Sequence, residues 1–126
     1  VIETPWKYAF FIDLTFNNLS GEIPQNIGDL VNLEYLYLYE NNFTGQILDD
    51  IINLENLKFI DLANNNFSGE IPLDIGNLSN LEYFVLFGNS LTGQIPVEIT
   101  NLQNSEISNF SKFRVFVIAL RRCTAL

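Results

Sequence analysis

The sequence has no histidine and no methionine, and Cys123 is its single cysteine. These absences exclude a histidine-based catalytic triad, a histidine metal site and a disulfide within the chain. Cations are scarce too, since six Lys and Arg residues stand against fifteen Asp and Glu, for a formal net charge of −9. Binding to nucleic-acid phosphates needs clustered cations, so the composition predicts no nucleic-acid partner.

The chain of 126 residues has the length of one domain, and 48% of its residues are hydrophobic, which is enough for a buried core. Its longest apolar run, around Val115–Leu120, falls far short of the ~20 residues of a membrane span. Val1 opens the chain without a signal-like segment, as expected of a processed chain or a fragment.

An internal period of 24 residues runs through most of the chain. The columns that keep it are Leu14, Leu38, Leu62 and Leu86; Asn17, Asn41, Asn65 and Asn89; Gly21, Gly45, Gly69 and Gly93; Ile23, Ile47, Ile71 and Ile95; and Leu30, Leu54, Leu78 and Leu102. So many columns on one period are not an effect of composition. They predict a stack of equivalent coils that share their core with their neighbours.

One coil shows how its residues would fold. Leu36 and Leu38 have the two-residue spacing of a strand that turns alternate side chains inward. The next inward residue is Asn41, and an amide in a core must be hydrogen-bonded, so the Asn column is predicted to bond the backbone after each strand. The Gly column predicts a bend with positive φ. The later apolar residues, Ile51 and Leu54, suffice for about one helical turn on the return side.

These strings resemble the leucine-rich repeat, and more closely its 24-residue plant-type variety. The sequences NLSGEIP at 18–24 and LTGQIP at 91–96 carry the resemblance, which covers about residues 9–104. It implies an α/β repeat fold: a right-handed solenoid with a parallel concave β-sheet and short helical, 3-10 or extended convex segments. We expect one leucine-rich-repeat domain over 1–126, with an N-terminal cap (1–8), four 24-residue repeats (9–104) and an irregular C-terminal repeat or cap (105–126).

Both ends break the pattern. Trp6 is in phase with Leu30 and would cover the open core, although the paired cysteines usual in the cap of plant extracellular members are absent. Residues 105–109 are interpreted as an insertion and 110–120 as a final strand. The alternative is a basic tail, out of frame with the fold, that leaves an apolar strand exposed. A dimer through an end, or through the apolar strand at 113–120, would extend the surface.

Aromatic and acidic side chains gather on the predicted outer face of the parallel sheet. The predicted ligand-binding residues are Phe11, Asp13, Glu34, Tyr35, Tyr37, Tyr39, Phe59, Asp61, Tyr83, Val85 and Phe87. One interpretation is that the aromatics are strand formers that pack on each other. The other is that an aromatic patch edged by acids, Glu40 among them, exceeds what a solvated face needs. We hypothesise that this face binds a protein or peptide and favours basic segments.

Two other surface patterns have simpler explanations. The column Glu34, Lys58, Glu82 alternates in sign, which favours stacking of coils rather than recognition. Asn-x-Ser/Thr sequons would be glycan sites in a secreted chain, and several recur through the repeat itself, which weakens the signal. They begin at Asn18, Asn42, Asn66, Asn77 and Asn109.

The sequence predicts no enzyme and no cofactor. Asp49 and Asp50 are the only adjacent acids and fall in a segment where a solvated turn is expected. Asp13 and Asp61 would lie roughly 10 Å apart on an open face, near the ~6.5–9.5 Å of inverting glycosidases, but without a cleft.

The sequence therefore predicts a binding module. The resemblance implies an ectodomain of a receptor-like kinase or receptor-like protein, or a secreted polygalacturonase inhibitor, located outside the cell or at its surface. A different class stays open, because some plant proteins of this repeat type act on ice. The hydroxyls that would form such a surface are those of Ser20, Thr44, Ser68 and Thr92, with Asn18, Asn42 and Asn66 beside them.

Overall fold

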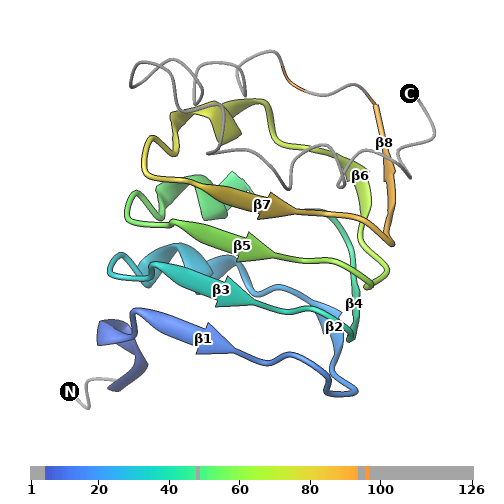
Figure 1. The fold of residues 1–126 in the computed structure, drawn as a ribbon, viewed down its shortest axis with the longest axis horizontal. Helices are drawn as coiled ribbons and strands as arrows, with labels where there is room; N and C mark the ends of the chain where they lie inside the picture. Colours follow the sequence, from blue (N-terminus) through green and yellow to red (C-terminus); the bar gives the residue numbers. More distant parts are fainter. Residues whose placement is uncertain (1–4, 48, 94–95, 97–126) are drawn as a thin grey trace.

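A computed structural model describes residues 5–47, 49–93 and 96 of the chain. Successive coils lie one on the next, and each combines a short strand, a second strand and a 3-10 segment. Figure 1 shows β1, β3, β5 and β7 stacked in order, with the 3-10 segments to their left and β2, β4, β6 and β8 to their right. This arrangement confirms the predicted solenoid with a parallel concave sheet.

Three kinds of element recur along the chain. The four-stranded parallel sheet contains β1 (Phe11–Asp13), β3 (Tyr35–Tyr37), β5 (Phe59–Asp61) and β7 (Tyr83–Val85). The flank strands are β2 (Ser20–Glu22), β4 (Asn42–Thr44), β6 (Ser68–Glu70) and β8 (Ser90–Thr92). The 3-10 segments are η1 (Pro5–Tyr8), η2 (Gln25–Asp29), η3 (Asp49–Asn53) and η4 (Leu73–Asn77). In the described part of the chain, no helix is long and apolar enough to cross a membrane.

The flank strands were not predicted, and their register differs from that of the concave sheet. In the concave sheet Phe11 pairs with Tyr35, 24 positions on, so equivalent residues of successive coils lie directly opposite each other. On the flank, Ser20 pairs with Asn42, 22 positions on, and β6 and β8 keep the same offset. Equivalent residues on the flank are therefore displaced along the strands by two positions per coil.

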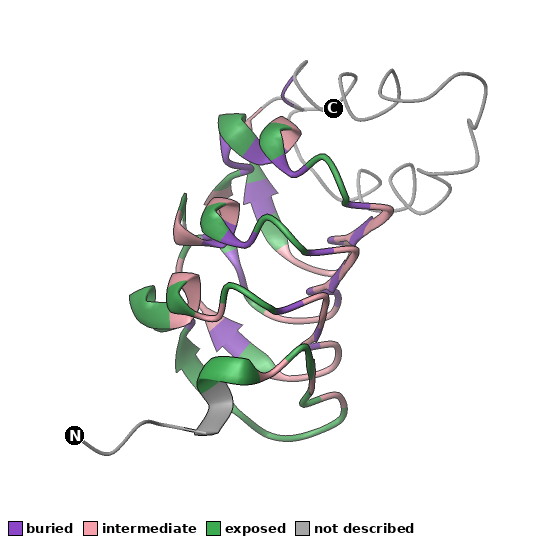
Figure 2. Cartoon of the chain, turned by 90° about the vertical axis from the view of Figure 1, so that its left-hand side faces the viewer, coloured by how far each residue is buried: buried purple, intermediate pink, exposed green. Residues whose placement is uncertain are grey.

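The core consists of the inward side chains of successive coils. On the middle residues of the strands, Leu36, Ile60 and Phe84 are each 1% exposed. Phe43, Phe67 and Leu91 close the core on the flank, and Ile51 and Ile75 close it beneath the 3-10 segments. Figure 2 shows these buried positions recurring from coil to coil.

The first coil departs from this pattern. Leu14 is 37% exposed and Leu19 38%, whereas their equivalents in the next coil, Leu38 and Phe43, are 3% and 8% exposed. Leu14 is therefore not part of the core, unlike its equivalents Leu38, Leu62 and Leu86, and no described coil precedes it. In Figure 2 the coil nearest the N-terminus is mostly exposed.

The predicted caps are only partly covered by the structure. Residues 5–8 of the expected N-terminal cap form η1. The side chain of Trp6 and all of residues 105–126 lie outside what the structure describes. The predicted insertion at 105–109 and final strand at 110–120 therefore stay predictions.

The Asn column makes the hydrogen bonds predicted for it and joins neighbouring coils. Asn65 donates from Nδ2 to the carbonyls of Leu62 (3.2 Å) and Ala63 (3.1 Å) in its own turn, and to that of Leu38 (2.8 Å) in the preceding coil. Its Oδ1 accepts the backbone N–H of Phe43 at 3.0 Å. Asn41 and Asn89 repeat this set in their own coils.

The Gly column adopts the predicted bend, with φ between +78° and +88° at Gly21, Gly45, Gly69 and Gly93. Space is a second reason for glycine at Gly45. A Cβ there would lie 2.7 Å from Cγ of Glu22, whose side chain covers the bend from the preceding coil.

Replacing Asn65 with Ala should lower the free energy of unfolding by about 2–5 kcal/mol, because it leaves the Phe43 N–H and the Leu38 carbonyl without a partner in a partly buried place. Asn17→Ala is the matched control, since among the described residues that exposed amide bonds only its own turn, at Leu14 and Thr15. It should cost less than about 1 kcal/mol. Urea unfolding followed by circular dichroism measures both, and equal losses would contradict the inter-coil role.

Candidate functional site

In-register pairing of the concave sheet places its outward side chains in columns. We define the concave face as three of them, which continue from the strands into the residues just after. They are Phe11, Tyr35, Phe59 and Tyr83; Asp13, Tyr37, Asp61 and Val85; and Thr15, Tyr39, Ala63 and Phe87. The predicted aromatic residues and Val85 thus share one face. Ala63 in the third column is fully buried.

The first column is a continuous row of ring contacts, tilted between Phe11 and Tyr35 and stacked from Tyr35 to Tyr83. The ring centroids of Phe11 and Tyr35 are 5.8 Å apart, those of Tyr35 and Phe59 5.3 Å, and those of Phe59 and Tyr83 4.4 Å. These contacts support the interpretation that the column stabilises the sheet. Phe11, at the end of the stack, is nevertheless 49% exposed, and the other three rings are half-buried.

The two remaining tyrosines of β3 and its exit each contact two rings. Tyr37 meets Phe11 edge-on, with centroids 5.6 Å apart, and stacks on Tyr35 at 6.4 Å. Tyr39 meets Phe16 edge-on at 5.2 Å and Phe87 at 6.4 Å. Both are half-buried. The pKa of Tyr37 is raised, chiefly by burial and then by the neighbouring Tyr35 and the carboxylates of Asp13 and Asp61.

Asp13 and Asp61 flank Tyr37 in the second column, where the strand register pairs both with it. Each carboxylate accepts a backbone N–H from two residues on, Thr15 at 2.9 Å and Ala63 at 3.1 Å. Their environments differ. The hydroxyl and N–H of Thr15 lower the pKa of the exposed Asp13, whereas burial raises that of the half-buried Asp61.

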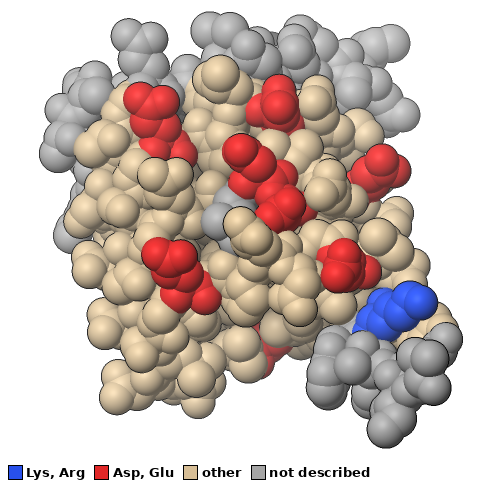
Figure 3. All heavy atoms as spheres, turned by 180° about the vertical axis from the view of Figure 1, so that it is seen from behind, with Lys and Arg blue, Asp and Glu red and all other residues tan. Residues whose placement is uncertain are grey.

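Acidic side chains are not confined to the concave face. Figure 3 shows them scattered over the side opposite to that of Figure 1, with basic atoms at one lower corner. Such a distributed negative charge attracts cationic partners without selecting where they bind. Any selection in favour of the concave face must therefore come from its aromatic side chains and from the few carboxylates beside them.

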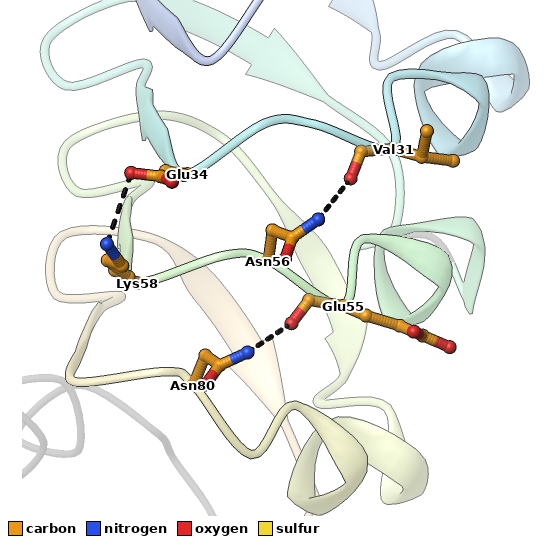
Figure 4. Close-up of polar contacts among 6 residues, drawn as sticks. All are labelled: Val31, Glu34, Glu55, Asn56, Lys58 and Asn80. Atoms are coloured by element: carbon orange, nitrogen blue, oxygen red, sulfur yellow. Dashed lines mark hydrogen bonds and ion pairs between the residues drawn. The ribbon is translucent and has the colours of Figure 1, made fainter.

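Two acids predicted to edge the aromatic patch are engaged within the protein. Glu34 forms an ion pair with Lys58 of the next coil, at 3.2 Å (Figure 4), and this contact raises the pKa of Lys58. Glu40 accepts a hydrogen bond from the Asn64 amide at 2.9 Å. The ion pair of Glu34 with Lys58 links neighbouring coils. It supports the interpretation that the column of alternating charge, Glu34, Lys58 and Glu82, stabilises the stack rather than binds a ligand.

A second amide ladder, which the sequence analysis missed, lies where the return segments meet the sheet (Figure 4). Asn56 donates to the carbonyl of Val31 at 2.8 Å, and Asn80 to that of Glu55 at 2.9 Å. The signal was present, because Asn32, Asn56 and Asn80 keep the 24-residue interval. This ladder is structural and lends no chemistry to the concave face.

Two further features also lay beyond the sequence analysis. Phe16, Glu40 and Asn64 all have φ between +53° and +57°, as each strand turns toward the flank.

A hollow of about 610 Å³ beside η2 is lined by Ile27 and Leu30, among others, and by none of the predicted ligand-binding residues. No group of His, Cys, Asp or Glu suited to a metal ion occurs within 5–47, 49–93 and 96.

The sequons lie on the surface as far as the structure describes them. Asn18, Asn42, Asn66 and Asn77 are all exposed, and Asn42 opens the flank strand β4. Asn109 lies outside the described residues. The flank is separate from the concave sheet (Figure 1), so glycans there would leave that sheet open.

Comparison with protein families gives one match. The family model described as Leucine Rich Repeat matches at residues 11–30, 32–54, 56–78 and 80–102, together more than half of the chain. A search of curated proteins gave no match.

Among solved structures, the chain is similar to plant receptor ectodomains. It is 41% identical to a TDR receptor with a TM-score of 0.73, and 37% identical to the HAESA ectodomain of Arabidopsis, solved with a peptide hormone ligand, with the same TM-score. The matches cover 74% and 77% of this chain but only 16% of either receptor. A plant ice-binding protein is 31% identical, with a TM-score of 0.70, over 72% of this chain and 30% of its own.

Asp61→Asn should stabilise the protein more at pH 7 than at pH 3. Burial raises the pKa of Asp61 in the folded state, so the folded carboxyl holds its proton to higher pH than the unfolded one, and stability falls as pH rises through that pKa. Asparagine removes this loss and keeps an oxygen for the Ala63 N–H. Denaturant unfolding of both proteins at the two pH values measures the difference, and a gain that is larger at pH 3 would contradict the assignment.

Proposed function

Because the chain belongs to the leucine-rich repeat family, we propose that it is a non-catalytic module that binds a peptide or an extended protein segment on its concave face. The observation that carries the proposal is that Tyr35, Tyr37 and Tyr39 lie side by side on one face and stay partly exposed in spite of their contacts with neighbouring rings. Tyrosine suits this role, since it is rigid, large and carries a polar tip.

The structural relatives support the receptor-like part of this proposal. The HAESA ectodomain was solved with a peptide hormone, so one relative with this coil geometry binds a peptide. We propose by the same comparison that the chain works outside the cell or at its surface, as part of a receptor. A secreted recognition protein such as a polygalacturonase inhibitor is the alternative that the resemblance of its repeats implies. The chain spans only a small part of those receptors, and its own ligand is to be found by experiment.

Ice binding is the second candidate, and the similar ice-binding protein is the observation that favours it. The flank register counts against it. Thr44 pairs with Glu22 and Thr92 with Glu70, and Ser68 faces Gln46 on one side and Ser90 on the other, so the hydroxyls of the repeat column do not face each other. With a displacement of two residues per coil, successive hydroxyls lie roughly 8 Å apart instead of ~4.8 Å. A sparse row interrupted by carboxylates suits a crystal surface less well than the aromatic face suits a peptide.

Association through an end stays a prediction. The first coil offers an apolar end, since Leu14, Leu19 and Phe16 are exposed there. The apolar strand predicted at 113–120 lies outside the described residues.

Tyr37→Ala and Tyr39→Ala should each weaken binding at least tenfold, because each removes a large ring from the centre of the face. The probe is the tightest binder selected from a library of random linear dodecapeptides, measured by fluorescence anisotropy. Each variant should lower Tm by no more than ~8 °C, the scale of about 1 kcal/mol in a small domain.

The matched control is Leu73→Ala, which removes an exposed apolar side chain from η4. It should leave the affinity unchanged. If the tyrosine variants bind the peptide as tightly as the parent chain, the rings are purely structural and the proposal fails.

Expression through a eukaryotic secretory pathway should add N-linked glycans at the exposed sequons Asn18, Asn42, Asn66 and Asn77. Each Asn→Gln change should remove one step of the mass that peptide N-glycosidase releases. Asn53→Gln is the control, since that exposed asparagine heads no sequon. A secreted chain whose mass the glycosidase does not change would overturn the assignment.

A further inference from the structure

Of the acids around the aromatic patch, Asp13, Asp61 and Glu40 have no cation beside them in the described structure. The described cations are Lys7 and Lys58. Lys58 is paired with Glu34, and the Lys7 ammonium lies 6.0 Å from the ring centre of Tyr8. Glu40 accepts a hydrogen bond from the Asn64 amide, which holds that carboxylate in place without compensating its charge. Within the second column of the concave face, the uncompensated negative charge lies at two carboxylates, those of Asp13 and Asp61.

These two carboxylates flank one ring. The register pairs Asp13 with Tyr37 on one side and Asp61 with Tyr37 on the other, so each acid is one strand spacing, about 4.8 Å, from the tyrosine. Tyr37 is half-buried and therefore keeps part of its surface open to solvent. An aromatic surface between two carboxylates attracts a cation in two ways, through the quadrupole of the ring and through the charges beside it.

The burial of Asp61 is a second reason to expect a cation beside Tyr37. Burial disfavours its charged form, and the single hydrogen bond from Ala63 only partly offsets that cost. A cation that arrives with a ligand would stabilise the charged carboxylate in its half-buried position. Thr15 already stabilises the charge of Asp13, so that carboxylate is ready to pair. The two acids would thus contribute unequally, with the larger gain at Asp61.

We infer that the surface over Tyr37, between Asp13 and Asp61, is a subsite for an arginine side chain of the bound peptide. The inference rests on the proposed function, since it assigns one contact within the same face. Arginine fits better than lysine, because its planar guanidinium stacks on an aromatic ring while its edges donate to carboxylates. The ring stack of the first column would then hold apolar or aromatic side chains of the same ligand.

The test uses dodecapeptides selected from the random linear library against the unmodified chain. The selected peptides should be enriched in arginine. In the tightest of them, replacing that arginine with citrulline, which has the same shape without the charge, should weaken binding to the parent chain at least tenfold. The double variant Asp13→Asn, Asp61→Asn should bind the two peptides within about twofold of each other. Asparagine keeps an oxygen for the N–H groups of Thr15 and Ala63, so the variant should fold.

The control variant is Asp49→Asn, Asp50→Asn, which removes the same amount of charge from η3. It should retain the tenfold preference for arginine over citrulline. If the preference persists in the Asp13 and Asp61 variant, or if the selected peptides carry no basic residue, the subsite is wrong while peptide binding stands. If the library yields no binder, or only binders that Tyr37→Ala and Tyr39→Ala leave unaffected, the proposed function fails and the subsite with it.

Discussion

The hydrogen bonds from Asn41, Asn65 and Asn89 to the preceding coil are the constraint on which the rest of the structure depends. Each amide bonds the turn of its own strand and both a carbonyl and an N–H of the coil before, so one residue fixes the bend and the stacking together. An insertion between Leu62 and Asn65 would separate the amide from the carbonyls of its own turn. The fixed spacing from the strand to the Asn in every coil is thus a condition for keeping these partly buried amides satisfied.

That fixed stacking is also what gives the concave face its character. Because the sheet pairs at the interval of the repeat, residue types that recur in the sequence become neighbours in space. In the first column this produces rings that stabilise each other, as between Phe59 and Tyr83. In the second column it sets Tyr37 between two carboxylates whose negative charge has no cation beside it in the described structure. Under the proposed function, the second column would bind the charge of a ligand while the first column stabilises the sheet.

Most of the fold could be predicted from the sequence, because every coil repeats the same residues. The conformation that those residues favour in one coil therefore predicts the whole stack. The bonds of Asn65 and the positive φ of Gly45 follow from what an amide and a glycine can do at those positions. The flank register could not be predicted, since a 24-residue interval does not say that strands pair 22 positions apart. In the site, the columns followed from the period. The engagement of Glu40 and the burial of Asp61 did not, because both depend on how neighbouring side chains lie.

Because the stack depends on side-chain amides, it is sensitive to deamidation. Slow hydrolysis of the Asn65 amide to a carboxylate would keep the oxygen that accepts the Phe43 N–H but remove every proton given to the Leu38, Leu62 and Ala63 carbonyls. A negative charge would then face carbonyl oxygens across the junction of two coils. Damage of this kind at one side chain would weaken both the turn of its own coil and the junction with the coil before.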